Sequence, residues 1–216
     1  MFRRSAAPPL AGAYAALAVL VAAGRLTGVD GWAVVHLMPG WHGPGAPPTL
    51  LDGLVPLYDA SWDGAWDAAA NVVTLPAQAL VASLVVATCC ALLWRRGRKR
   101  TALAWAAAWV AGNLVELLCK SVLARPLLHR HGVPLPAFDS SFPSGHTLRS
   151  VLLAATVSVV APGSRRWVAA WAAASIALLD LDGVHVPSDI AGGLLLAGLT
   201  IVVAASAEER TAATGS

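Results

Sequence analysis

The chain has 216 residues, of which 57% are hydrophobic and 12% are charged, and its formal net charge is +3. This composition excludes a disordered chain and argues against an ordinary soluble domain. The sequence has no basic stripe interleaved with aromatic residues, so nucleic acid is not an expected partner. Several apolar segments approach the length of about 20 residues that a helix needs to cross a bilayer.

The first apolar segment runs from about residue 10 to residue 26 and follows the basic pair Arg3-Arg4. A basic start, an apolar middle and small residues near the end are also typical of a cleaved signal peptide. We favour a retained transmembrane helix within residues 1–28, because the remainder of the chain already has the pattern of a membrane protein.

Residues 29–71 interrupt the apolar pattern with prolines, glycines and several tryptophans. Tryptophan is enriched at the membrane–water interface. We therefore expect an extracytoplasmic or interfacial loop, in which residues 50–58 lie along the interface. His36 and His42 are expected to be loop residues rather than ligands.

Residues 72–206 hold the other apolar segments, and residues 207–216 form a polar tail. We expect transmembrane helices at about residues 73–94, 102–119, 143–160, 167–179 and 187–205. With the first segment, they predict an all-α integral membrane bundle of six transmembrane helices. Near the end of the second of these segments, Glu116 and Lys120 are spaced for a contact one helical turn apart.

The basic residues indicate the orientation of this bundle in a cell membrane. Those on the side that holds both termini are Arg3, Arg4, the run at 95–100, Arg165, Arg166 and Arg210. By the positive-inside rule, this side is the cytoplasm. Those on or near the outer side are Arg25, Lys120, Arg125, Arg130 and Arg149. Charges near a membrane are costly and usually have a function, so we expect a site on the extracytoplasmic side.

One candidate element of that site is the stretch Ser141–Thr147, which precedes an apolar run. Its proline is tolerated in the first turn of a helix, so the stretch indicates a helix start on the outer side. A helix start offers unpaired backbone N–H groups and a positive dipole end, which suit a phosphate. The alternative is a capped helix start whose histidine, His146, has no function.

A second outer turn, at residues 185–189, begins the last apolar segment. His185 and Asp189 are four residues apart and share a helix face. A carboxylate there can accept a hydrogen bond from one imidazole nitrogen and leave the other nitrogen nucleophilic. His146 can then act as general acid toward a leaving alkoxide and as general base toward water. Lys120 and the loop arginines supply positive charge for a phosphoryl group.

The sequence does not predict a metal ion or another cofactor. It has no triple of histidine and carboxylate residues at metal-binding spacing. Cys89, Cys90 and Cys119 lie in apolar segments without the paired spacing of a zinc site or a disulfide framework.

The motifs Pro-Ser-Gly-His at 143–146 and His-x-x-x-Asp at 185–189 follow a Lys/Arg-Pro element at 120–126. In this order they resemble the type-2 phosphatidic acid phosphatase family. That family includes bacterial lipid phosphatases and shares its site with vanadium haloperoxidases. The resemblance covers about residues 70–205.

The resemblance implies a role for each matching residue. His185 would be the nucleophile that forms a phosphohistidine, Asp189 would orient it, and His146 would be the acid and base. The phosphate-binding groups would be Ser144, the Gly145 backbone and Lys120.

The chain departs from the family pattern at two places. The second Arg-Pro pair of the first motif is replaced by Leu127-Leu128, and the Ser-Arg of the third motif by Leu178-Leu179. Each lost charge-assisted contact to phosphate costs roughly 1.5–3 kcal/mol. The candidates for compensation are Arg125, Arg130 and Arg149. For Arg149, which lies three residues after His146, the alternative is a side chain that extends to the membrane interface.

Two other sets of residues lie near the expected site. His129 and His131 are expected to be loop residues rather than catalysts. Asp180 and Asp182 would repel phosphate unless they are paired, and we expect an ion pair with a loop arginine.

The sequence therefore predicts a metal-independent membrane phosphatase that acts on a lipid phosphate or an isoprenoid diphosphate at the outer membrane face. The main alternative is a weak or inactive member that binds phospholipid head groups. A soluble haloperoxidase disagrees with the short apolar chain. A structural or transport bundle would leave His146, His185 and Asp189 without a role.

Overall fold

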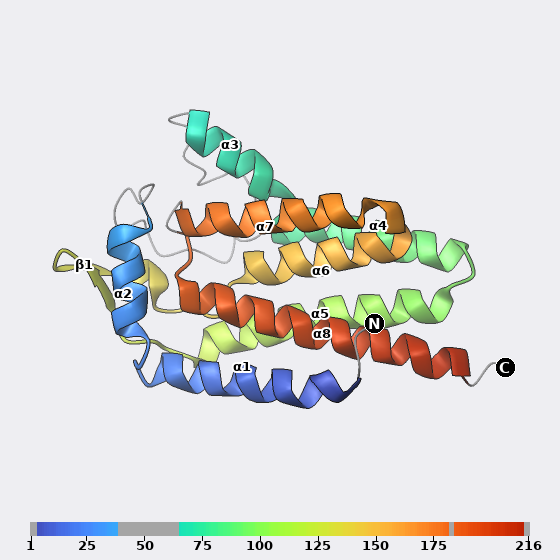
Figure 1. The fold of residues 1–216 in the computed structure, drawn as a ribbon, viewed down its shortest axis with the longest axis horizontal. Coiled ribbons are helices and arrows are strands. Elements are labelled where there is room, and N and C mark those ends of the chain that lie inside the picture. Colours follow the sequence, from blue (N-terminus) through green and yellow to red (C-terminus); the bar gives the residue numbers. More distant parts are fainter. Residues whose placement is uncertain (1–3, 39–64, 182–183, 214–216) are drawn as a thin grey trace.

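The computed structural model describes residues 4–38, 65–181 and 184–213, and it shows long helices that lie side by side (Figure 1). The long helices are α1 (Ala7–Ala22), α4 (Ala79–Arg95), α5 (Lys99–Val122), α6 (Gly145–Val160), α7 (Arg165–Leu181) and α8 (Pro187–Ala213). Each overlaps one of the six apolar segments of the sequence. The segment expected to be one helix at about residues 73–94 is interrupted, because α4 begins only at Ala79 and is bent by 50° from Ala69–Ala77. The predicted all-α class is confirmed.

Short elements join these helices. They are η1 (Arg4–Ala6), α2 (Thr27–His36), α3 (Ala65–Thr74), η2 (Leu75–Ala77), β1 (Leu128–Arg130), β2 (Val133–Leu135), η3 (Pro136–Phe138) and η4 (Pro162–Ser164). The strands β1 and β2 form an antiparallel hairpin in which Leu128 pairs with Leu135. Helix α2 bends by 80° from α1. In Figure 1 it lies beside the hairpin, across the left-hand end of the bundle.

The segment expected to be a loop, residues 29–71, therefore contains most of α2 and the greater part of α3. His36 lies in α2, where its Nδ1 is 2.8 Å from the carbonyl oxygen of Trp32 and its ring stacks on the Trp32 ring. Residues 50–58 and His42 lie outside the described residues.

The apolar helices indicate a membrane protein. By length and hydropathy, α5 and the Pro187–Ala207 part of α8 can each cross a membrane. The number rises to four if two bent pairs are each one span, namely α1 with α2 and Ala69–Ala77 with α4. Helix α6 is apolar but shorter. The six-span bundle thus stays a prediction.

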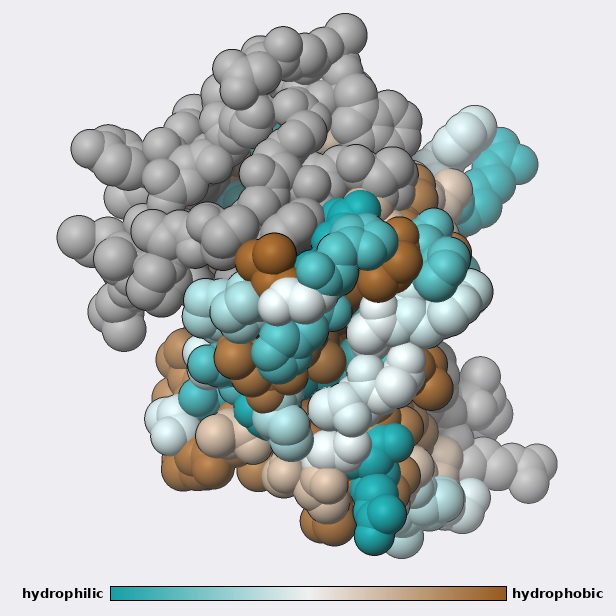
Figure 2. All heavy atoms as spheres, turned by 90° about the vertical axis from the view of Figure 1, so that its left-hand side faces the viewer, coloured by the Kyte–Doolittle hydropathy of each residue, from teal (hydrophilic) through white to brown (hydrophobic). Residues whose placement is uncertain are grey.

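Two of the apolar clusters lie near the candidate site, and a third joins α4 to α6 through Ala82, Val86 and Leu153. The larger joins α5, α6 and α8 through Trp105, Ala108, Leu148, Leu152, Leu196, Ala197, Ile201 and Ala204. The smaller joins α2 and the hairpin to the start of α8 through Val34, Met38, Leu128, Leu135, Phe138 and Val186. The smaller cluster therefore attaches α2 next to His185. Seen from this end, hydrophilic and apolar residues are mixed on the described surface (Figure 2).

Helices α6 and α8 approach closely where Gly193 faces the start of α6. A Cβ at Gly193 would lie 2.6 Å from the carbonyl oxygen of Ser144 and 2.8 Å from Cβ of Thr147. Only a residue without a side chain fits this contact, as is common where membrane helices touch.

We expect Gly193→Ala to lower the unfolding temperature in detergent, because the added methyl forces α8 away from α6 at a cost of about 1–3 kcal/mol. Gly198→Ala in the same helix is the matched control, since its Cβ would lie 3.8 Å from Leu10, an ordinary contact. In the control, the gain in helix propensity is about 1 kcal/mol and should hold or raise the unfolding temperature. Equal unfolding temperatures would contradict the close contact.

Candidate active site

The two outer turns meet at one end of the bundle. Ser144 ends the loop before α6, and its Oγ accepts a hydrogen bond from the Thr147 backbone N–H at 3.2 Å. Its own N–H donates to the Asp189 carbonyl oxygen at 2.9 Å. The first hydrogen bond caps α6, and the second ties that cap to the first turn of α8. The rings of His146 and His185 consequently lie with their centroids 5.9 Å apart.

Asp189 faces the imidazole of His185. Its Oδ2 is 3.6 Å from His185 Nδ1, slightly beyond hydrogen-bonding length, and Nδ1 has no hydrogen-bond partner among the residues that the structure describes. Asp189 is fully buried, and His185 is 6% exposed. The i,i+4 arrangement expected from the sequence is therefore present, with the carboxylate next to one nitrogen of the ring.

The other oxygen of Asp189 is held by Arg125. The Arg125 guanidinium donates to Asp189 Oδ1 at 2.9 Å, and it also pairs with the carboxylate of Asp30 in α2. Its Nη2 donates to Ser188 Oγ at 3.0 Å. Arg125, a candidate for binding phosphate, is thus buried between two carboxylates.

Asp30 was not among the predicted site residues, although it is fully buried here. A signal was present in the sequence, because Asp30 is a single carboxylate within an apolar stretch, and such charges usually have a partner. That partner, Arg125, is 95 residues away in the chain, so no local spacing reveals it.

Three predicted phosphate-binding residues converge on the carboxylate of Glu116. Lys120 Nζ lies 2.6 Å from Glu116 Oε1, which confirms the contact expected one turn apart. Arg149 Nη1 lies 3.4 Å from Glu116 Oε2. A Cβ at Gly145 would overlap the Glu116 carboxylate, so this carboxylate lies against the start of α6.

Arg149 is held inside the bundle rather than at an interface. Its Nε donates to the carbonyl oxygen of Ala77 at 2.9 Å, and its Nη1 is 3.4 Å from Asn113 Oδ1. The side chain is 9% exposed. The alternative in which Arg149 extends toward a membrane interface therefore does not describe this structure.

The remaining loop residues take separate places. Leu128 is buried in the smaller apolar cluster, whereas Leu127 is 40% exposed. His129 and His131 are exposed on the hairpin, and Arg130 donates to the Met38 carbonyl oxygen. The side chains of Asp180 and Asp182 lie outside the described part of the structure.

A metal site does not emerge from the described residues. Among residues 4–38, 65–181 and 184–213, no three His, Cys, Asp or Glu side chains form a group that could hold a metal ion.

Burial lowers the pKa of His185, and the positive charge of Lys120 lowers it further. The Asp189 carboxylate, supported by Glu116, opposes this shift without cancelling it. The folded protein therefore favours the neutral imidazole, which is the form that can act as a nucleophile.

The lowered pKa predicts how stability depends on pH. Below the ordinary histidine pKa of about 6.5, the unfolded chain binds a proton at His185 more readily than the folded chain. Acidification from pH 7.5 to pH 5.5 should therefore lower the unfolding temperature of the wild type more than that of His185→Gln. Parallel pH profiles of the two proteins would show that His185 titrates normally.

Comparison with known proteins identifies the part of the chain that carries this site. Residues 117–211 match the family model of the PAP2 superfamily. No curated protein and no solved structure matches the chain. The superfamily implies phosphatase activity on lipid phosphates. The match to the PAP2 superfamily model thus covers the segment that holds Lys120, His146, His185 and Asp189, and it is consistent with a type-2 phosphatidic acid phosphatase.

Proposed function

We propose that this protein hydrolyses a lipid phosphomonoester or an isoprenoid diphosphate through a phosphohistidine at His185, without a cofactor. The observation that carries the proposal is the meeting of His146, His185 and Asp189 at one end of the bundle, with Asp189 facing the His185 ring. His146 and His185 would lie roughly 130 Å apart in an extended chain and come together here, which a purely structural bundle does not require.

In the first step, Nε2 of His185 attacks phosphorus, and the bond from phosphorus to the leaving oxygen breaks. His146 donates a proton to that oxygen, so an alcohol leaves from a monoester and a lipid monophosphate leaves from a diphosphate. The phosphoryl group stays on Nε2, and the ring becomes positively charged. The Asp189 carboxylate, 3.6 Å from Nδ1, stabilises this charge.

In the second step, water attacks the phosphohistidine. His146 accepts a proton from the water, the bond between phosphorus and Nε2 breaks, and inorganic phosphate leaves. The nucleophile His185 is then neutral again, and the proton that His146 gained restores the acid for the next cycle.

The phosphoryl oxygens would bind at the start of α6. The Ser144 hydroxyl accepts from Thr147 and can still donate its own hydrogen. The backbone N–H groups of Gly145 and His146 add donors at the positive end of the helix dipole. Lys120, whose side chain is 30% exposed, supplies positive charge.

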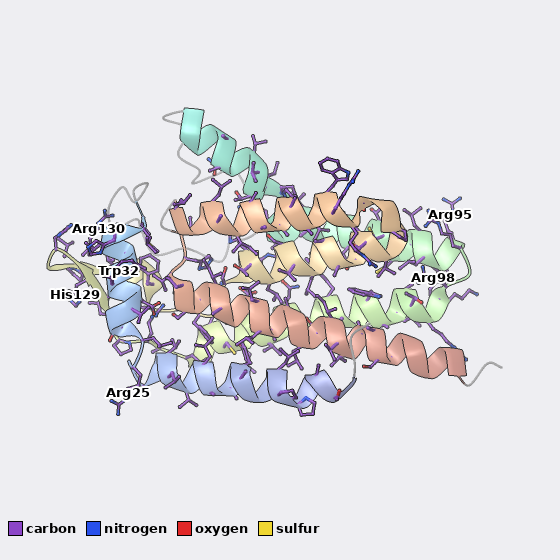
Figure 3. All side chains as sticks on the ribbon, viewed as in Figure 1. Arg25, Trp32, Arg95, Arg98, His129 and Arg130 are labelled. Carbon is purple, nitrogen blue, oxygen red and sulfur yellow. The ribbon has the colours of Figure 1, made fainter. Side chains whose placement is uncertain are left out.

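The distribution of basic residues supports the proposed membrane orientation. Figure 3 shows Arg95 and Arg98 at one end of the bundle, and Arg25 and Arg130 at the end that holds the site. The α4–α5 turn lies within the basic run at 95–100, which is typical of the cytoplasmic side. Both termini would then be cytoplasmic, and the site would receive head groups from the outer leaflet while the tail lies along the helices.

The direct test is phosphate release by purified protein from phosphatidate, phosphatidylglycerol phosphate and a polyprenyl diphosphate. His185→Ala should lower turnover of the accepted substrate by about three orders of magnitude or more, because the covalent step is lost. His129→Ala, which changes an exposed histidine on the hairpin, is the control and should keep wild-type turnover. Equal phosphate release by the wild type and by His185→Ala would refute the proposal.

A second candidate function is binding of phospholipid head groups with little or no hydrolysis. The observation that favours it is the charge balance around Glu116, whose carboxylate is shared by Lys120 and Arg149. At positions 127 and 128, leucines replace the family's second Arg-Pro pair. These two positions therefore add no positive charge for a phosphate. A substrate phosphate must compete with an internal carboxylate for the same two cations.

The variant Glu116→Gln measures this competition. Removing the carboxylate charge should lower the dissociation constant of inorganic phosphate by roughly tenfold, a change of about 1.4 kcal/mol. The measurement is isothermal titration with inorganic phosphate, which needs no turnover. Asp139→Asn, a change at an exposed loop carboxylate, should leave phosphate affinity unchanged. Weaker phosphate binding by Glu116→Gln would instead mean that Glu116 positions Lys120 rather than competing with substrate.

A further inference from the structure

Helix α2 brings a buried carboxylate to the site from outside the residues that match the superfamily. Residues 117–211 match, whereas Asp30 lies in the first turn of α2. Val34 and Met38 pack against the hairpin and Val186, so α2 is attached on the side of the His185 turn. The fully buried Asp30 side chain lies within this contact.

Asp30 is bonded to the first turn of α8 at two points. Its Oδ1 accepts a hydrogen bond from the Ser188 backbone N–H at 3.1 Å, and its Oδ2 accepts one from Ser188 Oγ at 2.7 Å. The first backbone N–H groups of a helix have no partner within the helix. Asp30 therefore caps α8 from another helix, and its charge is favourable at that positive end.

The same carboxylate fixes Arg125. Nη2 of Arg125 pairs with Asp30 and with Ser188, and Nη1 pairs with Asp189. The guanidinium is planar and rigid, so holding one edge at Asp30 sets the direction of the edge that meets Asp189. Without Asp30, the hydroxyl of Ser188 would be the one partner left to Nη2 among the described residues.

We propose that Asp30 is a positioning residue, which acts through Arg125 and Ser188 to hold the Asp189 carboxylate against His185. The inference rests on the proposed function of His185 as nucleophile. One guanidinium between two carboxylates leaves a net charge of −1 beside the ring. This negative charge stabilises the positive ring of the phosphohistidine. The positive charge of Lys120 destabilises that ring, and the negative charge of Glu116 stabilises it.

The first test is Asp30→Asn, which keeps the shape and removes the charge. We expect kcat to fall by about 10–100-fold, because the ring is held less well, and KM to change by less than about twofold, because Asp30 does not touch substrate. Asp139→Asn is the matched control and should keep both constants. A wild-type kcat in folded Asp30→Asn, or a change in KM alone, would overturn the proposal.

If Asp30→Asn does not fold, Ser188→Ala tests the positioning role of Asp30 in its place. Ser188→Ala removes the hydrogen bonds that Ser188 Oγ makes with Asp30 and with Arg125, and it leaves the direct pair of Asp30 with Arg125 in place. A kcat several-fold below wild type at unchanged KM supports the proposal, and a wild-type kcat refutes it. If both variants fold, their effects should be less than additive, because they act along one path.

A measurement without turnover separates this inference from the proposed function. In protein with ¹⁵N-labelled histidine, NMR reports which ring nitrogen of His185 carries hydrogen, and the spectrum of His185→Gln assigns the signal. Wild type should show hydrogen on Nδ1, facing Asp189, and Asp30→Asn should show a mixture of both tautomers. The same single tautomer in both proteins would refute positioning by Asp30, whether or not any lipid phosphate is hydrolysed.

Discussion

The site depends on one buried cation, the Arg125 guanidinium, which is held between the carboxylates of Asp30 and Asp189. Charges taken out of water are tolerated only when their partners are in place, and breaking such a pair costs about 3–5 kcal/mol. The three partners come from α2, from the loop after α5 and from α8. Segments distant in the sequence are therefore tied together at the point where the chemistry is proposed.

Backbone contacts set the second constraint. The hydrogen bond from Ser144 N–H to the Asp189 carbonyl oxygen joins the starts of α6 and α8 directly. Gly193 permits this contact, because a side chain there would meet the Ser144 carbonyl. The separation of the two helix starts that carry His146 and His185 is thus set by main-chain contacts. This arrangement suits a reaction in which one histidine attacks and the other transfers a proton.

Charge balance at the start of α6 differs from what the motifs alone suggest. Lys120 and Arg149 both contact Glu116, so part of their positive charge is neutralised before any substrate arrives. In the low-dielectric interior such a pair interacts strongly, and an incoming phosphate must replace those contacts with better ones. The dianionic charge of a terminal phosphate is favoured over a single carboxylate for this exchange.

Local sequence patterns were enough to predict many of the helices and part of the candidate site. Apolar segments predicted the positions of the six long helices, except that the segment at 73–94 is interrupted before α4. The Pro-Ser-Gly-His and His-x-x-x-Asp motifs led to the superfamily whose model matches residues 117–211. The spacing of Glu116 and Lys120 predicted their contact, because an α-helix fixes which residues share a face. Helix α2 and the hairpin were missed, since their stability comes from packing on the smaller apolar cluster rather than from a periodic pattern.

The sequence by itself determined which residues are the candidates for the proposed chemistry, because motif spacing places His185 and Asp189 on one helix face and His146 at a helix start. Only the tertiary structure decided what surrounds them. It turned Arg125 toward two carboxylates, brought Asp30 to Ser188 and buried Leu128 beneath α2. These contacts join residues far apart in the chain, and their partners depend on how helices pack, which no local spacing encodes.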